Sequence, residues 1–378
     1  MSSSRRKDSI ARLFVDTSNK ASDIKKTDHA DKPRNKHHPL KIVELAVVDG
    51  FPLDPQRTLS AHDACDDFSL PPTLSLYDPS NDETDNDAFP TSLKPIDMTD
   101  CKFIKKIGSG SSADVFRATW QNKDIAVKKM DFSYIQFKRE AAFLHKLTEL
   151  NAPNIVQFIG YSTDNLNYFY LGMEYVPGGS LDCLLDSARE LSWSLRISFM
   201  LDIARAIDFL HQMKILHRDV KSPNIFLRAN FQLVLGDFGS AIYFDQKQSF
   251  AGTIAWMAPE LFAQKPATPA SDIFSVAVTF WEIASRQVPY EAHKEQSMIK
   301  IVSEGHRENI PLTCPKDIAD LITESWDQDP TKRPTAGKLL ARLSMLAEKS
   351  KINVSPIDVP EKEKSAKRNT DQKRFRSF

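Results

Sequence analysis

The chain has 378 residues, among which 50 Lys+Arg and 50 Asp+Glu give a formal net charge of zero. This balance argues against a dedicated nucleic-acid-binding protein, because such proteins usually carry a clear basic excess. The length allows one large domain with tails or two modest domains, and either arrangement can bury a sizeable core.

Residues 1–97 have a composition that disfavours folding. They hold nine of the 22 prolines, the polar run NDETDND, only five aromatic residues and none of the five tryptophans. Such a segment buries too little apolar area to offset its chain entropy. We therefore predict a disordered leader over 1–97 and an ordered domain over 98–346. The chain then becomes polar and charged again, which predicts a disordered basic tail over 347–378.

The first part of the ordered region has the pattern of a small sheet. Residues 103–129 alternate in polarity and are rich in β-branched or aromatic side chains, which predicts three short antiparallel strands. In residues 134–147 apolar side chains recur at steps of three and four, as on one face of a helix. The apolar runs 155–161 and 168–174 indicate two more strands.

The pattern becomes helical after the Pro-Gly-Gly sequence at 177–179. The apolar residues that define the helical spacing are Ile197, Leu201, Ala204, Ile207 and Leu210. The sequence therefore predicts an α+β fold, in which a small sheet-rich part precedes a larger helical part.

Two charged side chains fall at positions that the pattern predicts to be buried. Alternation along the strand around 125–128 puts Ala126 and Lys128 on one face, and Glu140 lies on the apolar stripe of the following helix. Because lysine and glutamate are rarely buried unless they are paired, we expect Lys128 and Glu140 to meet. The pair alone leaves open the alternative that either side chain extends to water.

A glycine-containing turn lies twenty residues before Lys128, with Gly108 and Gly110 between two predicted strands. Glycines there let the backbone of a hairpin approach phosphate oxygens with its N–H groups. A single Gly-x-Gly turn is weak evidence, and Ala113 stands where a Gly-x-Gly-x-x-Gly pattern has its third glycine. The spacing to a strand lysine is what favours a phosphate-binding turn over an ordinary hairpin.

Further motifs follow in a fixed order: His-Arg-Asp at 217–219 with Asn224, Asp-Phe-Gly at 237–239 and Ala-Pro-Glu at 258–260. Together with the glycine turn, Lys128 and Glu140, they resemble a eukaryotic-type protein kinase. The resemblance covers residues 100–346. It implies the bilobal kinase fold, with a small lobe over 98–175 that has a five-stranded antiparallel sheet and one helix. The larger lobe, 176–346, would be mainly helical.

The resemblance also implies the roles of the polar residues. Lys128 would hold the α- and β-phosphates of ATP, and Glu140 would fix Lys128. Asp219 would take the proton of the substrate hydroxyl, and Lys221 would neutralise charge on the γ-phosphoryl group. For Mg²⁺, or Mn²⁺ in its place, the resemblance implies two oxygen ligands. These metal ligands are Asn224 and Asp237.

The nucleotide would lie between the two lobes. The resemblance puts the adenine between Val115 and Ala126 on one side and Phe226 on the other, with the backbone of the hinge at its edge. The ATP-binding residues that it implies are Ile107, Gly108, Gly110, Val115, Ala126, Lys128, Met173, Glu174, Val176 and Phe226.

Lys221 and Thr253 indicate the type of substrate, because tyrosine-specific relatives usually have an alanine-rich catalytic loop instead. We therefore predict an ATP- and Mg²⁺-dependent protein serine/threonine kinase that acts in intracellular signalling. A non-catalytic kinase-fold scaffold and a dual-specificity kinase are the alternatives. The Trp-Met-Ala-Pro-Glu sequence at 256–260 and Trp-Glu at 281–282 resemble the tyrosine-kinase-like group, the relatives of Raf and mixed-lineage kinases.

This resemblance implies two structural contacts and one regulatory site. Arg333 would pair with Glu260, and Asp272 would cap the catalytic loop. Arg218 would receive a phosphate from the activation segment, because a phosphate can order a loop against arginine. Ser249 is the predicted phosphorylation site, since Thr253 is needed for substrate positioning. An ordinary exposed loop serine is the alternative.

Partners and location are predicted from the flanking segments. We expect protein substrates, and an upstream kinase or docking partner that binds the leader, where residues 36–42 resemble a docking peptide for mitogen-activated kinases. A homodimer, as in Raf-like relatives, is left open. We expect no nucleic-acid partner, and no apolar run is long enough for a signal peptide or a membrane span. Four widely spaced cysteines favour a reduced compartment. A cytoplasmic location is predicted, and the basic residues near 367–374 leave nuclear entry open.

Overall fold

The computed structural model describes residues 95–109, 113–130, 134–163, 168–246 and 250–352. The predicted disorder of residues 1–94 and 353–378 lies outside this described part. Gly110 and Ser249, two of the predicted site residues, also lie outside it.

A five-stranded antiparallel sheet forms the smaller lobe, with strand order β1-β2-β3-β5-β4. A two-residue turn connects β2 and β3, and its residues Gln121 and Asn122 have φ angles of 49° and 60°. Positive φ at both central positions is the geometry that matches the right-handed twist of a hairpin. The strands are β1 (Lys102–Ser109), β2 (Ala113–Trp120), β3 (Lys123–Met130), β4 (Phe158–Thr163) and β5 (Phe169–Glu174).

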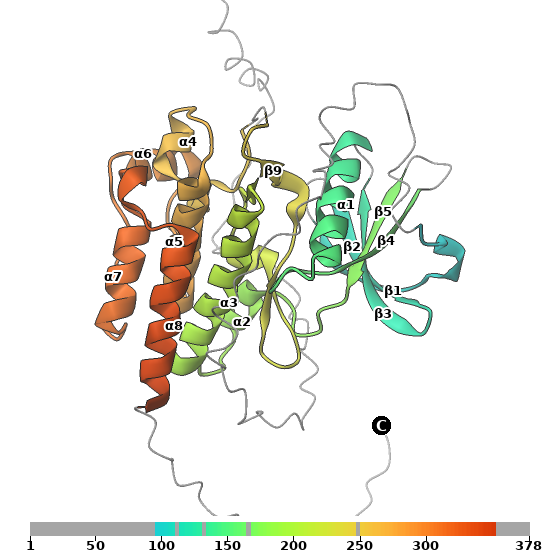
Figure 1. The fold of residues 1–378 in the computed structure, drawn as a ribbon, viewed down its shortest axis with the longest axis horizontal. Coiled ribbons are helices and arrows are strands. Elements are labelled where there is room, and N and C mark those ends of the chain that lie inside the picture. The colour runs from blue at the N-terminus through green and yellow to red at the C-terminus, as the bar shows by residue number, and fades with distance from the viewer. Residues whose placement is uncertain (1–94, 110–112, 131–133, 164–167, 247–249, 353–378) are drawn as a thin grey trace, which may run out of the picture. The chain divides into compact units, whose positions relative to one another are not determined.

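Helix α1 (Tyr134–Glu149) packs beside this sheet (Figure 1). Phe137, Ala141 and Leu144 are buried along one face of the helix, as the periodicity predicted. The ring of Phe137 stacks on that of Phe169 in β5, with centroids 4.9 Å apart. The apolar face of α1 therefore fixes the helix on the sheet, and with it the position of Glu140.

A second apolar cluster includes residues that precede the first strand. Ile96 is 4% exposed and packs in this cluster with Cys101, Ala118, Ile125 and Val127. The Ile96 N–H donates to the carbonyl of Tyr161 in β4 at 2.7 Å. A side chain at Gly172 would lie 2.6 Å from the Ile96 Cδ1 atom, so the glycine makes room for Ile96. Residues 95–97, which the sequence assigned to the leader, thus pack on the sheet.

The larger lobe is mainly helical, and α5 is buried along almost its whole length. Helices α3 and α8 lie side by side in Figure 1. The helices are α2 (Leu181–Asp186), α3 (Trp193–Gln212), α4 (Pro259–Phe262), α5 (Pro269–Ser285), α6 (Glu295–Ser303), α7 (Lys316–Ser325) and α8 (Ala336–Ile352). The predicted α+β fold with two lobes is confirmed. Helix α8, however, continues six residues past the predicted boundary at 346, because Ala347 is still buried on its inner face.

Two short ribbons carry the loops of the site. They pair β6 (Ile215–Leu216) with β9 (Ile242–Tyr243), and β7 (Ile225–Leu227) with β8 (Leu233–Leu235). The strand predicted over 155–161 begins only at Phe158, because Ile155 instead bridges to Leu235 in β8.

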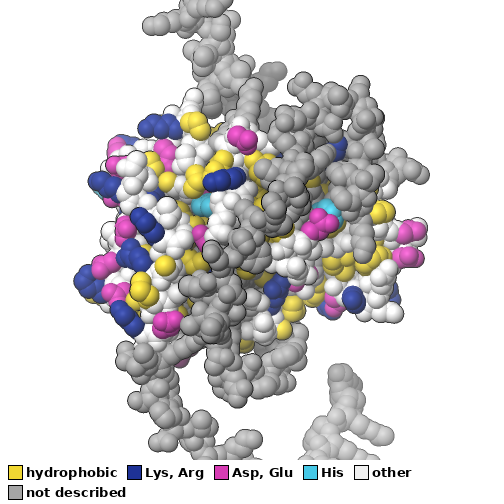
Figure 2. Space-filling view, viewed as in Figure 1, with side chains coloured by type: hydrophobic (Ala, Val, Ile, Leu, Met, Phe, Trp, Pro, Cys, Tyr) yellow, Lys and Arg dark blue, Asp and Glu magenta, His cyan; other side chains and the backbone are white. Residues whose placement is uncertain are grey.

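The surface of the larger lobe is mixed in charge. Figure 2 shows Lys and Arg side chains interspersed with Asp and Glu over the helices at the left. Among the described residues, no helix is both long enough and apolar enough to cross a membrane.

Candidate active site

Lys128 joins three elements of the fold. Its Nζ atom lies 2.8 and 2.9 Å from the two carboxylate oxygens of Glu140 in α1, and 2.9 Å from Oδ1 of Asp237. The predicted ion pair between Lys128 and Glu140 is therefore confirmed. Burial lowers the pKa of Lys128, but the two carboxylates outweigh burial and raise this pKa above its ordinary value. The ammonium group stays charged over the physiological pH range.

Asp237 has a backbone conformation that few non-glycine residues adopt, with φ 56° and ψ 76°. Phe238 beside it is fully buried, and its ring meets that of His217 edge-on with centroids 5.0 Å apart. Burial raises the pKa of Asp237, but Lys128 outweighs burial and lowers it, so the carboxylate is ionised. Its side chain is 44% exposed. The buried ring of Phe238 therefore fixes the backbone next to Asp237, whose carboxylate is partly exposed.

Asp272 in α5 holds the loop that carries Asp219. Its carboxylate accepts the N–H groups of His217 and Arg218 at 3.0 and 2.9 Å, and it lies 3.0 Å from Nε2 of His211. The predicted capping role of Asp272 is confirmed. Arg218 has φ 65°, so this cap stabilises a loop with a left-handed residue next to Asp219.

The Asp219 carboxylate accepts hydrogen bonds from three side chains, two of which also bond to each other. Its Oδ1 accepts the Thr253 hydroxyl at 2.7 Å, and its Oδ2 accepts from Lys221 Nζ at 2.8 Å and from Asn224 Nδ2 at 3.0 Å. Lys221 also donates to the Thr253 hydroxyl oxygen at 2.6 Å. A carboxylate, a lysine amino group and a hydroxyl therefore meet at one point. Each carboxylate oxygen has two acceptor positions, which leaves Oδ1 one position for an incoming hydroxyl.

Asn224 and Asp237 offer donors that suit a hard cation. The Asn224 amide nitrogen donates to the Asp219 carbonyl at 2.8 Å and to its carboxylate at 3.0 Å, so the amide oxygen is the atom that could face a cation. The ionised carboxylate of Asp237 is the second oxygen donor. Oxygen donors of this kind fit Mg²⁺ or Mn²⁺, which take carboxylates, phosphate oxygens and water.

The predicted nucleotide-binding residues lie on both lobes. Val115 and Ala126 are on the neighbouring strands β2 and β3, Met173 and Glu174 end β5, and Phe226 is on β7. Ile107 and Gly108 are on β1. The described residues of this set therefore come from both lobes.

The hinge between the lobes is tied to the larger lobe by a contact that the sequence did not reveal. The Glu174 carboxylate pairs with Arg228 at 2.6 Å and also accepts the Gln157 N–H at 3.0 Å. The Gly178 N–H donates to the Leu227 carbonyl at 2.9 Å, and a side chain at Gly178 would clash with that carbonyl. The hinge segment that includes Val176 is therefore held at both ends, by the ion pair of Glu174 and by the backbone hydrogen bond of Gly178.

Comparison with known families assigns this architecture. Residues 101–343 match the family described as protein tyrosine and serine/threonine kinase. The chain is a protein kinase family member. The predicted family is thereby confirmed.

Several relatives carry kinase names. The chain is 33% identical over 273 residues to probable serine/threonine-protein kinase drkC of Dictyostelium discoideum, across 67% of this chain and 36% of the relative. It is 34% identical over 276 residues to probable serine/threonine-protein kinase roco7 of the same organism, across 67% of this chain and 10% of the relative. It is 32% identical over 248 residues to mitogen-activated protein kinase kinase kinase 13-B of Xenopus laevis, across 65% of this chain and 25% of the relative. The chain therefore spans little more than a third, or less, of the length of these relatives.

Two arginines of this kinase domain lie near the start of its activation segment. Arg218 Nε donates to the Ser240 carbonyl at 2.6 Å, and Arg139 Nη2 donates to the Gly239 carbonyl at 3.2 Å. Burial, followed by the charge of Arg139, lowers the pKa of Arg218 to about 10. An anion between the two guanidinium groups would relieve this repulsion.

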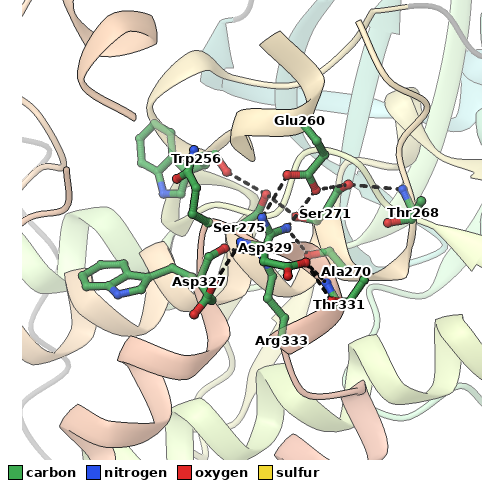
Figure 3. Close-up of polar contacts among 12 residues, drawn as sticks. Trp256, Glu260, Thr268, Ala270, Ser271, Ser275, Asp327, Asp329, Thr331 and Arg333 are labelled. Atoms are coloured by element: carbon green, nitrogen blue, oxygen red, sulfur yellow. Dashed lines mark hydrogen bonds and ion pairs between the residues drawn. The ribbon is translucent and has the colours of Figure 1, made fainter. Parts of the chain in front are cut away.

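A buried ion pair locks the kinase's larger lobe, as Figure 3 shows. Arg333 donates through both terminal nitrogens to the carboxylate of Glu260, at 2.8 and 2.9 Å. Ser271 Oγ also donates to Glu260 at 2.8 Å, and Arg333 donates to the carbonyls of Ala270 and Asp327. The predicted pairing of Arg333 with Glu260 is confirmed.

Sequence reasoning assigned no role to Glu282 beyond family resemblance. This residue of α5 is 4% exposed and accepts hydrogen bonds from Ser222 and Trp256, two residues that were not predicted as site residues. The signal was available, because a glutamate in the apolar sequence of α5 has the same mismatch of charge and burial that pointed to Glu140.

Proposed function

We propose that the chain is an ATP- and Mg²⁺-dependent protein serine/threonine kinase that transfers the γ-phosphoryl group to serine and threonine hydroxyls of protein substrates in intracellular signalling. The observation that carries the proposal is the set of hydrogen bonds among Asp219, Lys221 and Thr253. It combines a base, a charge-neutralising group and a positioning hydroxyl at one point. The names of the relatives support the same activity.

Transfer breaks the bond from the γ-phosphorus to ADP and forms a bond to the substrate oxygen, while the hydroxyl proton passes to Asp219. Lys221 stabilises the negative charge on the transferred group, and Lys128 binds the α- and β-phosphates while Glu140 holds it. A bound Mg²⁺ would neutralise phosphate charge, and Asn224 and Asp237 are the residues that would hold it. The chain's own contribution is therefore positioning and electrostatics.

The adenine would contact the predicted pocket residues of both lobes. Val115 and Ala126 would cover one face of the ring and Phe226 the other, and the backbone of Glu174 and Val176 would bind its edge. The ion pair from Glu174 to Arg228 supports this role, because it keeps the hinge backbone in one position.

Serine/threonine selectivity rests on Lys221 and Thr253, which both donate hydrogen bonds to the Asp219 carboxylate. A scaffold without activity and a dual-specificity kinase are the alternatives. Purified protein incubated with ATP, Mg²⁺ and a degenerate peptide mixture should phosphorylate serine and threonine, as mapped by mass spectrometry beside an Asp219→Asn control. No transfer above the control would favour the scaffold, and extensive phosphotyrosine would favour dual specificity.

Regulation and partners extend the proposal. A phosphate on Ser249 would bind Arg218, and the lowered pKa of Arg218 supports an anion at this place. An upstream kinase or docking partner would bind the leader, and the enzyme would act in the cytoplasm. Phosphosite mapping together with Ser249→Ala tests the first point: full activity of the variant, with Ser249 unmodified in active enzyme, would contradict it.

A further inference from the structure

Glu282 forms hydrogen bonds with two segments of the active site. It lies in α5, and its Oε1 accepts the Ser222 hydroxyl at 2.6 Å. Its Oε2 accepts the indole N–H of Trp256 at 2.7 Å, and the Ser222 N–H lies 3.4 Å from the same oxygen. All of these groups are hydrogen-bond donors. An ionised glutamate only accepts hydrogen bonds, so it can pair with each of them.

Both partners of Glu282 adjoin residues that contact Asp219. Ser222 directly follows Lys221. Trp256 ends a single turn of 3-10 helix, and its N–H donates to the Thr253 carbonyl at 2.9 Å. Lys221 and Thr253 in turn hydrogen-bond each other. One buried carboxylate therefore sets the separation of the two segments that form the substrate side of the site.

The protonation state of Glu282 decides how strongly it holds these segments. Burial raises the pKa of Glu282 to about 7, although the hydrogen bonds from Ser222 and Trp256 lower it and the charge of Asp182 adds a further increase. An indole N–H can only donate, so the bond to Trp256 changes from a charge-assisted one to a weaker neutral one when Glu282 is protonated.

Few other charged groups face Glu282 from the elements packed around it. Asp182 of α2 is a carboxylate, and Lys221 of the catalytic loop is committed to Asp219 and Thr253. Arg196 of α3 donates to the carbonyls of residues 283 and 284, directly after Glu282. Among the described residues, none forms an ion pair with Glu282 within 4.0 Å.

We propose that Glu282 is a positioning residue for phosphoryl transfer: its ionised carboxylate ties Ser222 to Trp256 and so keeps Lys221 and Thr253 aligned on Asp219, and protonation loosens the substrate side of the site. This inference rests on the proposed kinase function. It makes the use of the protein substrate, but not the binding of ATP, depend on pH around neutrality.

The test is kcat/KM for a peptide substrate between about pH 6 and 8.5, measured for the wild type and Glu282→Gln beside the KM for ATP. The glutamine imitates the protonated side chain. We expect peptide kcat/KM at high pH to fall about fivefold in the variant, because a charge-assisted bond becomes neutral, and the KM for ATP to stay unchanged. We expect the wild-type inflection near neutrality to disappear. Glu304→Gln, an exposed change at the residue that follows α6, is the matched control and should behave as the wild type.

Two further variants keep Glu282 and change the inflection in different ways. Asp182→Asn removes a charge that raises the Glu282 pKa, so the inflection should move to lower pH. Trp256→Phe removes the indole donor and with it the tie between the two segments, so peptide kcat/KM should fall at high pH and its inflection should flatten. The moved inflection in Asp182→Asn and the flattened one in Trp256→Phe test the inference even where Glu282→Gln fails to fold.

Stability separates positioning from a structural role. The raised pKa means that protonation of Glu282 favours the folded state, so this contribution is present at low pH and lost as pH rises through about 7. Thermal melts at high pH should therefore show Glu282→Gln to be as stable as the wild type or more so, while its peptide kcat/KM falls. Unchanged kcat/KM and an unchanged inflection in Glu282→Gln would overturn the inference, as would an unmoved inflection in Asp182→Asn together with an unflattened one in Trp256→Phe. Absence of transfer in every variant and in the wild type would instead contradict the proposed kinase function.

Discussion

The hydroxyl of Thr253 performs two tasks with one oxygen. It donates to Asp219 at 2.7 Å and accepts from Lys221 at 2.6 Å. Loss of the hydroxyl leaves the ammonium group bonded to Asp219 alone and removes one of the contacts that orient the base. The methyl group of threonine takes no part in these bonds.

We therefore expect Thr253→Val to lower kcat by about 10- to 100-fold, the order of effect of a misplaced acid–base group. Thr253→Ser keeps the hydroxyl and should stay close to the wild type. Steady-state kinetics with a serine peptide checks both variants. Equal losses in Thr253→Val and Thr253→Ser would show that the methyl group matters, which contradicts this assignment.

Helix α7 ends on a buried hydroxyl without a partner. Ser325 is fully buried, and its Oγ has no hydrogen-bond partner among the described residues. A buried hydroxyl of this kind costs stability, because it has left water without a replacement bond. The sequence position of Ser325 at the end of a helix does not reveal that its hydroxyl is buried without a partner.

Ser325→Ala should raise the free energy of unfolding by about 1 kcal/mol. Ser344→Ala in α8 is the control, because it makes the same change at a hydroxyl that donates to the Leu340 carbonyl at 2.9 Å. Urea unfolding should rank Ser325→Ala above Ser344→Ala. The reverse order would mean that the Ser325 hydroxyl has a favourable partner.

The pair of Glu260 and Arg333 connects α4 with the segment that precedes α8. Burial raises the pKa of Glu260, but Arg333 outweighs burial and lowers it below the ordinary value. This contribution to stability is therefore present above the ordinary glutamate pKa and is lost as pH falls through the lower, folded-state pKa.

Arg333→Met leaves the Glu260 carboxylate buried without its partner and should destabilise the fold by about 3 to 5 kcal/mol near neutral pH. The deficit should shrink on acidification, because Glu260 can then become neutral. Arg342→Met is the control, since Arg342 pairs with Glu324 at the surface, where an ion pair is worth about 1 kcal/mol or less. A deficit in Arg333→Met that is independent of pH would contradict this explanation.

Local patterns predicted the elements whose partners are close in sequence, and they failed where the partner is distant. The periodicity of α1 and the mismatch at Lys128 and Glu140 correctly predicted a packed helix and an ion pair. Ile155 has the side chain of a strand residue, yet its backbone bridges to Leu235, about 80 residues away. The hydrogen bonds that Glu282 accepts from Ser222 and Trp256 likewise depend on the packing of α5 against two loops. These loops are distant from Glu282 in the sequence, so no local spacing reveals the contact.

At the scale of the molecule, the residues before the first strand belong to the small lobe. Ile96 fills the space above Gly172 and extends the edge of β4 through Tyr161. Polarity alone did not reveal this contact, because a single buried isoleucine in a polar stretch makes it. Residues 95–97 are thus fastened to the sheet that carries Lys128.

Ile96→Ala should lower the free energy of unfolding by about 2 to 4 kcal/mol, the usual cost of a buried isoleucine truncated to alanine. Ile104→Ala, at a β1 position that is 47% exposed, should change it by about 0.5 kcal/mol or less. Thermal or urea unfolding compares the two. Equal effects would mean that Ile96 is not part of the core.

The most direct test of the kinase assignment is a single-turnover measurement of phosphoryl transfer from ATP and Mg²⁺ to peptides that differ only in the acceptor, serine, threonine or tyrosine. The geometry of Asp219, Lys221 and Thr253 predicts fast transfer to serine and threonine, slow transfer to tyrosine, and a loss of about 1,000-fold or more in Asp219→Asn. Transfer that does not exceed the Asp219→Asn rate, or that prefers tyrosine, would contradict the account.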